Sequence, residues 1–238
     1  MVLAVKVAGH GNESSLHSQV KAWYVKPGDR LEAEVDGYVV DIVRGDLLIE
    51  VQTKNFSAVR EKLRRLVQNH RLRLVFPIAV RKWIIHVAEG SGEVLGRRRS
   101  PKRGSLVDLF DELVRIPELM ASKRFELEVL LVEVEEVRCA DGQGSWRRRG
   151  VSILDRRLLR IVNCVRFCSA EDFLRFLPEQ LVQPFTNKDL AACAGVSLRL
   201  AQRITYSLRK MGVLLVVGKE GRALLHVVSV RPEKIFSL

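Results

Sequence analysis

The stretch DGYVVDIVRGDLLIEVQTK, residues 36–54, decides how the first half of this 238-residue chain is expected to fold. With the residues just before it, the stretch gives three short apolar runs separated by an Asp-Gly turn at 36–37 and an Arg-Gly-Asp turn at 44–46. Such turn residues between apolar runs are typical of β-hairpins. The sequence therefore predicts a meander of three strands over residues 31–53.

The segments on either side of the meander alternate between helical and strand patterns. Leu16, Val20 and Trp23 recur at helical spacing, so a first helix is predicted over about 13–23. This order of helices and strands predicts an α/β domain with a mixed sheet flanked by helices. The further elements predicted for it are an amphipathic helix over 56–69, a strand over 71–77 ended by Pro77, a strand over 82–87, an exposed cationic loop over 88–104, a helix with a proline break over 105–120, and a long strand over 125–138.

The second half of the chain has a different pattern, and ADGQGS at 140–145 is the best candidate for a linker. We expect a first domain over 1–139, a basic linker over 140–150 and a second domain over 151–238. Residues 152–162 fit a helix or a strand, and 169–178 fit a helix. The last stretch gives a helix, a tight turn at Gly195, a second helix, and a hairpin turned at 218–221. This order predicts a small α+β winged helix-turn-helix domain.

The chain is strongly basic, with 40 Lys and Arg residues against 28 Asp and Glu residues and a formal net charge of +12. A positive field of this size favours polyanions, above all nucleic acid and less so an anionic membrane. The sequence has no apolar run of the roughly 18 residues needed to span a bilayer, and its start does not match a secretory signal. We therefore expect a cytoplasmic protein without a membrane partner.

Polar side chains interrupt the apolar pattern of the meander. Strand alternation places Glu50 and Gln52 together on one face, and Asp41 approaches them from the preceding strand. Two carboxylates and the main-chain carbonyl of Val51 make a hard oxygen site suited to Mg²⁺ or Mn²⁺. Such an ion would hold a phosphate and lower the pKa of an attacking water molecule.

The motif D-x8-E-x-Q, carried by Asp41, Glu50 and Gln52 on a β-hairpin, resembles the signature of the PD-(D/E)XK nucleases, which include Holliday-junction resolvases and many restriction enzymes. The resemblance covers about residues 10–86. It implies a restriction-endonuclease-like fold, and a metal-site carboxylate from the first helix, where Glu13 stands. The family generally has lysine where this chain has Gln52, which weakens stabilisation of the phosphate transition state. Lys54, two residues further along, is expected to substitute in part.

The alternative interpretation is that Asp41 and Glu50 are ordinary solvated carboxylates at a strand edge, since the core of the motif also arises by chance in β-hairpins.

The second helix of the C-terminal domain predicts contact with DNA. Its apolar positions follow helical spacing, which leaves five polar side chains outward. Arginine and glutamine side chains are suited to reading guanine and adenine edges in the major groove. The predicted contacts on the helix are Arg199, Gln202, Arg203, Tyr206 and Lys210, and those on the hairpin are Lys219 and Arg222. A basic solvated face, or a winged helix that binds protein, explains the same pattern.

Two arginine triplets, at 97–99 and 147–149, flank the predicted domain junction. Arg99, Lys102 and Arg103 are expected to contact the DNA backbone through attraction that weakens with salt. Charges that keep a linker soluble are an equally good explanation.

The leading expectation is a metal-dependent DNA endonuclease that acts on duplex or branched DNA and is positioned by the winged helix. The rival is a non-catalytic DNA-binding transcriptional regulator with a degenerate nuclease fold, which Gln52 favours and the grouped carboxylates disfavour. An RNA-processing enzyme remains a third alternative, because charge does not separate RNA from DNA. A homodimer stays open, although the sequence reveals no apolar dimer surface.

Overall fold

The computed structural model describes residues 14–229, which divide into two compact units. The first unit comprises residues 14–53, 74–106 and 128–165, and the second comprises 54–73, 107–127 and 166–229. Each unit therefore collects segments that lie far apart in the sequence. No helix in the described part of the chain is long and apolar enough to cross a bilayer.

The meander predicted from the sequence is present as strands β1 (Arg30–Val35), β2 (Tyr38–Arg44) and β3 (Leu47–Val51). The three strands pair antiparallel, with Val35 opposite Tyr38 and Arg44 opposite Leu47. Asp36 and Gly37 both have positive φ angles, 49° and 78°. That conformation is the one that two-residue hairpin turns favour, which is why the Asp-Gly pair was a reliable signal.

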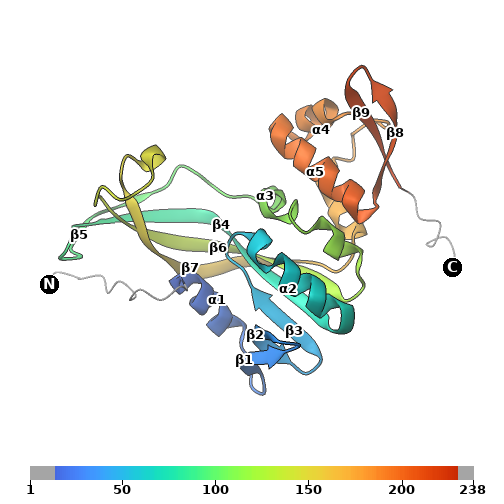
Figure 1. Cartoon of the computed structure of the whole chain (residues 1–238). Helices are drawn as coiled ribbons and strands as arrows, with labels where there is room; N and C mark the ends of the chain where they lie inside the picture. Colours follow the sequence, from blue (N-terminus) through green and yellow to red (C-terminus); the bar gives the residue numbers. More distant parts are fainter. Residues whose placement is uncertain (1–13, 230–238) are drawn as a thin grey trace. The chain divides into compact units, whose positions relative to one another are not determined.

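The meander continues into a seven-stranded sheet (Figure 1), formed within residues 14–229. Its order is β1-β2-β3-β4-β6-β7, and β5 pairs with β4 outside this path. The result is an α/β fold with a mixed sheet flanked by helices, as predicted. The strands added to the meander are β4 (Arg71–Val87), β5 (Val94–Arg99), β6 (Phe125–Cys139) and β7 (Ser152–Phe167).

The prediction of two separate strands over 71–87 is wrong, because β4 runs unbroken through Pro77. Pro77 lies between the part of β4 that meets β3, where Gln52 N–H donates to the Val75 carbonyl at 2.9 Å, and the part that pairs with β5 from Trp83 onward. Proline has no backbone N–H, so it is tolerated in a strand at a position where no hydrogen bond between strands requires one. It therefore does not end this strand.

The predicted loop over 88–104 is also partly wrong, since it contains β5. This strand pairs antiparallel with β4, with Arg99 opposite Trp83 and Arg97 opposite Ile85. Glycine and consecutive arginines are poor strand formers by composition, but cross-strand pairing with an apolar neighbour overrides that preference.

The segment 140–150, predicted to be an interdomain linker, joins β6 to β7, which are neighbours in the sheet. It contains one short 3₁₀ turn, η3 (Trp146–Arg148). The chain leaves the sheet only after Phe167, and residues 152–162, for which helix and strand were both open, belong to β7. Gly- and Ser-rich polar segments form long hairpin connections as readily as linkers, so composition alone did not separate the two.

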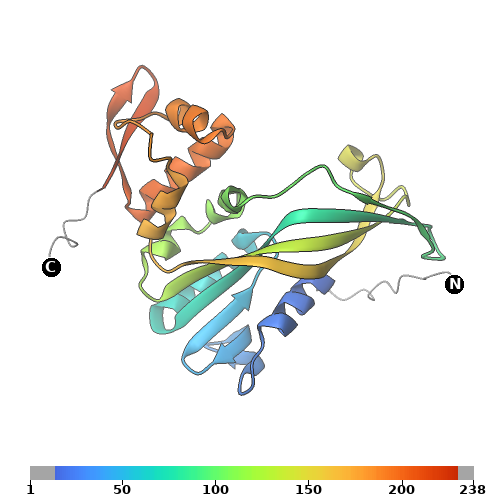
Figure 2. The ribbon, with the colours of Figure 1, turned by 180° about the vertical axis from the view of Figure 1, so that it is seen from behind.

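Helix α1 (Ser15–Tyr24) covers one face of the sheet in the first unit. Its three buried residues, Leu16, Val20 and Tyr24, pack against apolar side chains of the strands. The helix starts beside β7, because Ser15 Oγ donates to Asp155 at 2.8 Å. Figure 2 shows α1 alongside the sheet from the opposite side. The strand residues of this core are Ile42, Leu47, Ile49, Val51, Val75, Leu130, Val132 and Val134.

The second unit contains helix α2 (Phe56–Asn69), which begins and ends where the sequence predicted. The second unit also contains a cluster of phenylalanines. Phe167 stacks on Phe173 with ring centroids 4.3 Å apart, and Phe110 meets Phe176 edge-on at 4.9 Å. The predicted helices over 105–120 and 169–178 are shorter pieces. They are η1 (Leu106–Leu109), α3 (Phe110–Leu113), η2 (Pro117–Ala121) and η4 (Glu171–Phe176).

The C-terminal elements of the second unit appear in the predicted order: α4 (Asn187–Ala194), α5 (Leu198–Met211), β8 (Leu214–Glu220) and β9 (Ala223–Val228). Thr186 and Asp189 form a capping box at the start of α4, and Gly195 ends that helix with a φ of 63°. These signals fix both ends of α4, since a side-chain cap satisfies its first N–H groups and glycine adopts positive φ at low cost.

Candidate functional site

Asp41 and Glu50 lie at the point where β2 and β3 separate. The backbone pairing of the two strands reaches Ile42 and Ile49, and the next step of the same register brings Asp41 opposite Glu50. Beyond this point the Val51 N–H donates to the Asp41 carboxylate at 2.8 Å. A side chain thus takes the place of a strand carbonyl, which explains why a carboxylate is accommodated inside the sheet.

Both carboxylates are buried, with 8% of Asp41 and 6% of Glu50 exposed. Burial raises the pKa of Asp41, but this effect is outweighed by hydrogen bonds from His17 and the Val51 N–H and by the nearby charges of His17 and Lys21, so that its pKa lies below the usual value. Asp41 is therefore ionised at neutral pH. Ionised carboxylates are rarely buried unless cationic groups compensate them, and clusters of this kind are typical of functional sites.

His17 is a site residue that the sequence analysis missed. Its Nε2 donates to the Val51 carbonyl at 2.8 Å and lies 3.4 Å from Asp41 Oδ2. Imidazole therefore contacts two of the oxygens that were predicted to bind a metal. No spacing rule connects a histidine on a helix with a carbonyl 34 residues away, so only the packing of α1 on the sheet reveals the contact.

Lys21, one helical turn further along α1, supplies the ammonium group of the site. Its Nζ lies 3.8 Å from Asp41 Oδ1, and it also pairs with Glu32 of β1. The sequence analysis assigned this part to Lys54, which is exposed and belongs to the second unit. Lys21 reaches Asp41 because it follows His17 at i+4 on α1, which places both side chains on the same face of the helix.

The remaining predicted site residues are placed as follows. Gln52 is half-buried just after β3, and its main chain bonds to β4. Glu13, predicted to complete the metal site, lies outside the described residues. Within 14–229 there is no group of three or more His, Cys, Asp or Glu side chains placed to hold a metal ion.

The residue types at the strand fork, two carboxylates and a main-chain carbonyl, are of the kind that holds magnesium in proteins. This ion keeps several water ligands and is held in proteins by one or two carboxylates together with substrate phosphates. Asp41 Oδ2 and the Val51 carbonyl oxygen lie 3.4 Å and 2.8 Å from the same nitrogen, Nε2 of His17. The residues predicted to hold the ion are Asp41, Glu50 and the Val51 carbonyl, and of these Asp41 and Val51 both contact His17.

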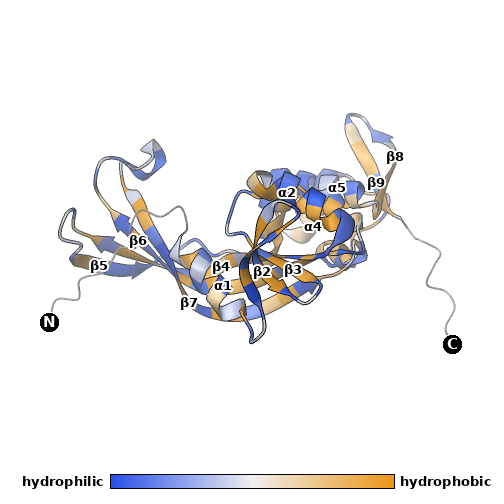
Figure 3. Ribbon diagram, turned by 60° about the horizontal axis from the view of Figure 1, so that its bottom comes forward, coloured by the Kyte–Doolittle hydropathy of each residue, from blue (hydrophilic) through white to orange (hydrophobic). Residues whose placement is uncertain are grey.

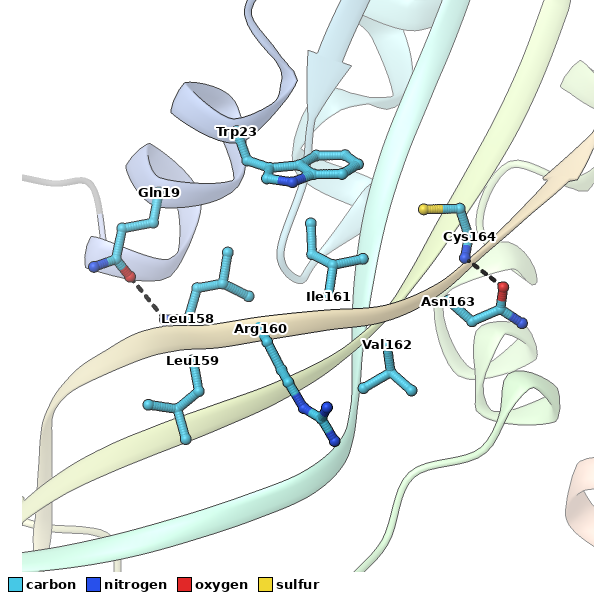
Figure 4. Close-up of a pocket in the computed structure, with 9 residues that line it drawn as sticks. All are labelled: Gln19, Trp23, Leu158, Leu159, Arg160, Ile161, Val162, Asn163 and Cys164. Atoms are coloured by element: carbon cyan, nitrogen blue, oxygen red, sulfur yellow. Dashed lines mark hydrogen bonds between the residues drawn. The ribbon is translucent and has the colours of Figure 1, made fainter.

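A separate groove of about 570 Å³ runs between α1 and β7 (Figure 4). Trp23 lies over it, and Leu158 and Ile161 point toward that helix, whereas Arg160 points to the other side of the strand. The residues that line the groove include no carboxylate. It therefore lacks the acidic groups that the strand fork provides.

Helix α5 carries an exposed polar stripe in the second unit. Arg199, Gln202, Tyr206 and Lys210 are all exposed and follow one another at intervals of three or four residues, so they lie on one face. Lys210 approaches the Tyr206 ring, with Nζ 5.9 Å from its centroid. Four of the five residues predicted to contact DNA from this helix are thus presented together.

Arg203 differs from the other four. It is only partly exposed and forms an ion pair with Asp111 of α3 in the same unit. Arg203 is therefore less accessible to a partner than the other four predicted contacts. Its position one residue after Gln202 turns it toward the neighbouring helix.

The other predicted DNA contacts are at the surface. Lys219 on β8 and Arg222 in the turn that follows are exposed, as are Lys102 and Arg103 after β5. Arg99 is exposed on β5, a regular strand instead of the predicted loop. These residues belong to different units, with the hairpin in the second and the β5 segment in the first.

Comparison with known proteins gives a family but no activity. A curated protein of Treponema pallidum (strain Nichols), described as uncharacterised, is 29% identical over 216 residues, which is 90% of this chain and 84% of that protein. No solved structure is significantly similar. A family model described as a domain of unknown function, DUF8091, matches residues 14–168, a range that begins just before α1 and ends just after β7. The chain therefore belongs to the DUF8091 family.

Proposed function

We propose that the protein is a metal-dependent DNA endonuclease, with its reaction site where β2 and β3 separate. The observation that carries the proposal is the pair of buried carboxylates, Asp41 and Glu50, at a strand fork where His17 and Lys21 lie beside Asp41. Burying carboxylates in a sheet is costly unless cationic groups compensate them. A site for a cation and a phosphodiester accounts for both residues.

The arrangement of elements agrees with the resemblance to PD-(D/E)XK nucleases. The chain order of helix, three-stranded meander, helix and strand places the three residues of the motif D-x8-E-x-Q on and just after two adjacent strands of one sheet. A bound Mg²⁺ or Mn²⁺ would supply Lewis acidity and lower the pKa of a water molecule at this site.

The chain's own residues have separate parts in this proposal. Asp41, ionised and oriented by the Val51 N–H, and Glu50 hold the cation. Lys21 provides a positive charge within 4 Å of Asp41 and is suited to stabilising negative charge on a phosphate, the part left open by Gln52. His17 contacts the Asp41 carboxylate and the Val51 carbonyl, so it competes with an ion for these two oxygens.

Binding of DNA is assigned to the C-terminal elements, read as a winged helix-turn-helix. The exposed stripe Arg199, Gln202, Tyr206 and Lys210 has the composition of a helix that contacts base edges. Lys219 and Arg222 on the hairpin are suited to phosphate contacts. The formal charge of +12 supports a polyanionic partner.

A second candidate is a DNA-binding regulator that does not cleave. It is favoured by the position of His17, which already contacts two of the oxygens that a metal would use. Gln52 in place of lysine favours it as well.

The test is cleavage of supercoiled plasmid and of branched DNA by the purified chain with Mg²⁺ or Mn²⁺. Asp41→Asn and Glu50→Gln are expected to abolish cutting while DNA affinity is retained. The matched control is Asp46→Asn, because Asp46 is an exposed carboxylate in the turn of the same hairpin, away from the fork. Metal-dependent cutting that survives in both site variants would refute the site, and DNA binding without cutting would select the regulator.

A further inference from the structure

The connection between β6 and β7 presents a tryptophan to solvent. We call residues 142–151 the Trp146 loop. The side chain of Trp146 is 82% exposed, and the three arginines that follow it are exposed too. The Arg147 guanidinium lies 5.4 Å from the centre of the indole ring. A large flat apolar surface and several cations therefore share one short segment.

The Trp146 loop is held by its own backbone. Gly144 N–H donates to the Gly150 carbonyl at 2.9 Å, and Val151 N–H donates to Arg148 at 3.1 Å. A Cβ on Gly144 would lie 2.0 Å from the Val151 carbonyl oxygen, so only glycine permits this closure. The tryptophan is thus carried on an ordered loop, and less conformational freedom is lost when a ligand binds to it.

A second arginine-rich segment lies at the same end of the first unit. Figures 1 and 2 show β5 and the Trp146 loop together at the end of the long strands, seen from both sides. The turn before β5 and the start of the connection line one small cavity of about 240 Å³, through Gly90 and Gln143 among others. On β5, the Arg97 guanidinium stacks 4.1 Å from the centre of the Trp83 ring.

Charge and chemistry identify the kind of partner. The Trp146 loop has three arginines and no acidic residue, and most of it is hydrophilic in Figure 3. Aromatic rings on which bases stack, set among cations that track the phosphates, are the recurring means of binding single-stranded nucleic acid. Duplex DNA keeps its bases stacked within the helix and offers no free face to Trp146.

We propose that the Trp146 loop binds an unpaired base in DNA, with the indole of Trp146 stacked on the base and Arg147, Arg148 and Arg149 on the flanking phosphates. The proposal rests on the proposed function and names its substrate class: DNA with a single-stranded portion, such as a flap, gap or branch.

The test compares fluorescence anisotropy of a labelled single-stranded oligonucleotide with that of a blunt duplex of the same sequence, using the full chain. Trp146→Ala is expected to weaken single-strand binding by about five- to a hundredfold, the range for loss of one stacked base, and to leave duplex binding unchanged within about twofold. Trp146→Phe retains most of the affinity, because phenylalanine still stacks. The matched control is Trp23→Ala, since Trp23 is also an exposed tryptophan but has no arginine run beside it.

Intrinsic fluorescence gives an independent readout, because the chain has three tryptophans. Single-stranded DNA is expected to quench the wild-type emission, and this quenching is lost in Trp146→Phe and kept in Trp23→Phe.

Equal losses on single strand and duplex in Trp146→Ala, or no loss on either, would overturn the stacking proposal. Tighter binding of single-stranded RNA than of DNA would overturn the assignment to DNA. These outcomes are distinct from failure of the proposed function, in which the wild-type chain binds DNA but does not cut it with Mg²⁺ or Mn²⁺.

Discussion

Glu136 is the most completely buried carboxylate of the sheet, and replacing it with glutamine should cost stability in a way that depends on pH. The residue is 0% exposed and contacts three cations: Arg138 at 2.5 Å, Arg156 at 2.8 Å and Lys82 at 3.4 Å. Glu136→Gln keeps the size and one carbonyl acceptor but removes the charge. The three cations then lack their common carboxylate.

The magnitude follows from the pKa of Glu136. Burial alone would raise this pKa. The hydrogen bonds from Arg138 and Arg156 and the charge of Lys82 have the larger combined effect, and the pKa falls from 4.5 to about 2. A fall of this size corresponds to about 3 kcal/mol of folding free energy at neutral pH. Because the pKa is lower in the folded chain than in the unfolded chain, this stabilisation is complete well above pH 4.5 and is lost as the pH falls toward 2. About 2 kcal/mol of it is lost by pH 3.

The assay is urea unfolding of wild type and Glu136→Gln, followed by circular dichroism at several pH values between 7 and 3. The difference in unfolding free energy between the two proteins is expected to be about 3 kcal/mol at pH 7 and to shrink to about 1 kcal/mol at pH 3. Subtraction of the two curves removes the titration of other carboxylates.

The control is Glu135→Gln, the neighbour on the opposite face of β6, which pairs with Arg97 alone at 2.9 Å. Its loss at pH 7 is expected to stay below about 1 kcal/mol, as for other exposed ion pairs. A difference for Glu136→Gln that is the same at pH 7 and pH 3 would refute the reasoning, because uncoupled packing damage does not titrate.

Three further changes test other parts of the structure. Thr186→Ala removes the capping box of α4 and should lower unfolding free energy by about 1 kcal/mol, measured by thermal unfolding; an unchanged transition would contradict the role of the cap. His17→Ala should strengthen binding of Mn²⁺, measured by electron paramagnetic resonance, because imidazole no longer contacts Asp41; weaker binding would make His17 a ligand. Arg203→Ala should leave DNA affinity nearly unchanged while Arg199→Ala lowers it, and the reverse ranking would show that the ion pair of Arg203 opens on binding.

Local signals predicted the elements that depend on local chemistry. The turn at 36–37 and helix α2 were located from the sequence because Asp-Gly favours the positive φ angles of a tight turn and α2 has a long amphipathic period. Pairing between distant strands was the part that failed. Pro77 and the basic residues 94–99 suggested interruption, yet both belong to strands of the sheet because neighbouring strands supply the pairing. The Gly-rich segment 140–145 suggested a linker between domains, but it connects two neighbouring strands, β6 and β7.

The candidate site was predicted in part for the same reason. Asp41 and Glu50 lie on strands joined by a short turn, and the register of β2 and β3 places the two residues opposite each other. His17 and Lys21 reach the same point from a helix, and their contribution depends on how α1 packs on the sheet. Lys54 was chosen by closeness in sequence, which is a weak guide once a strand has ended.

The hydrogen bond from the Leu158 N–H to the Gln19 side chain, 2.7 Å long, has a consequence for solubility. β7 is the last strand on its side of the sheet and is 16 residues long, and long open strands are templates on which other chains add and aggregate. Gln19 occupies one N–H of this strand, and the Asn163 side chain occupies that of Cys164. A strand from another molecule would have to displace both side chains to extend the sheet, so we expect these two amides to hinder strand addition at this edge when the protein is concentrated.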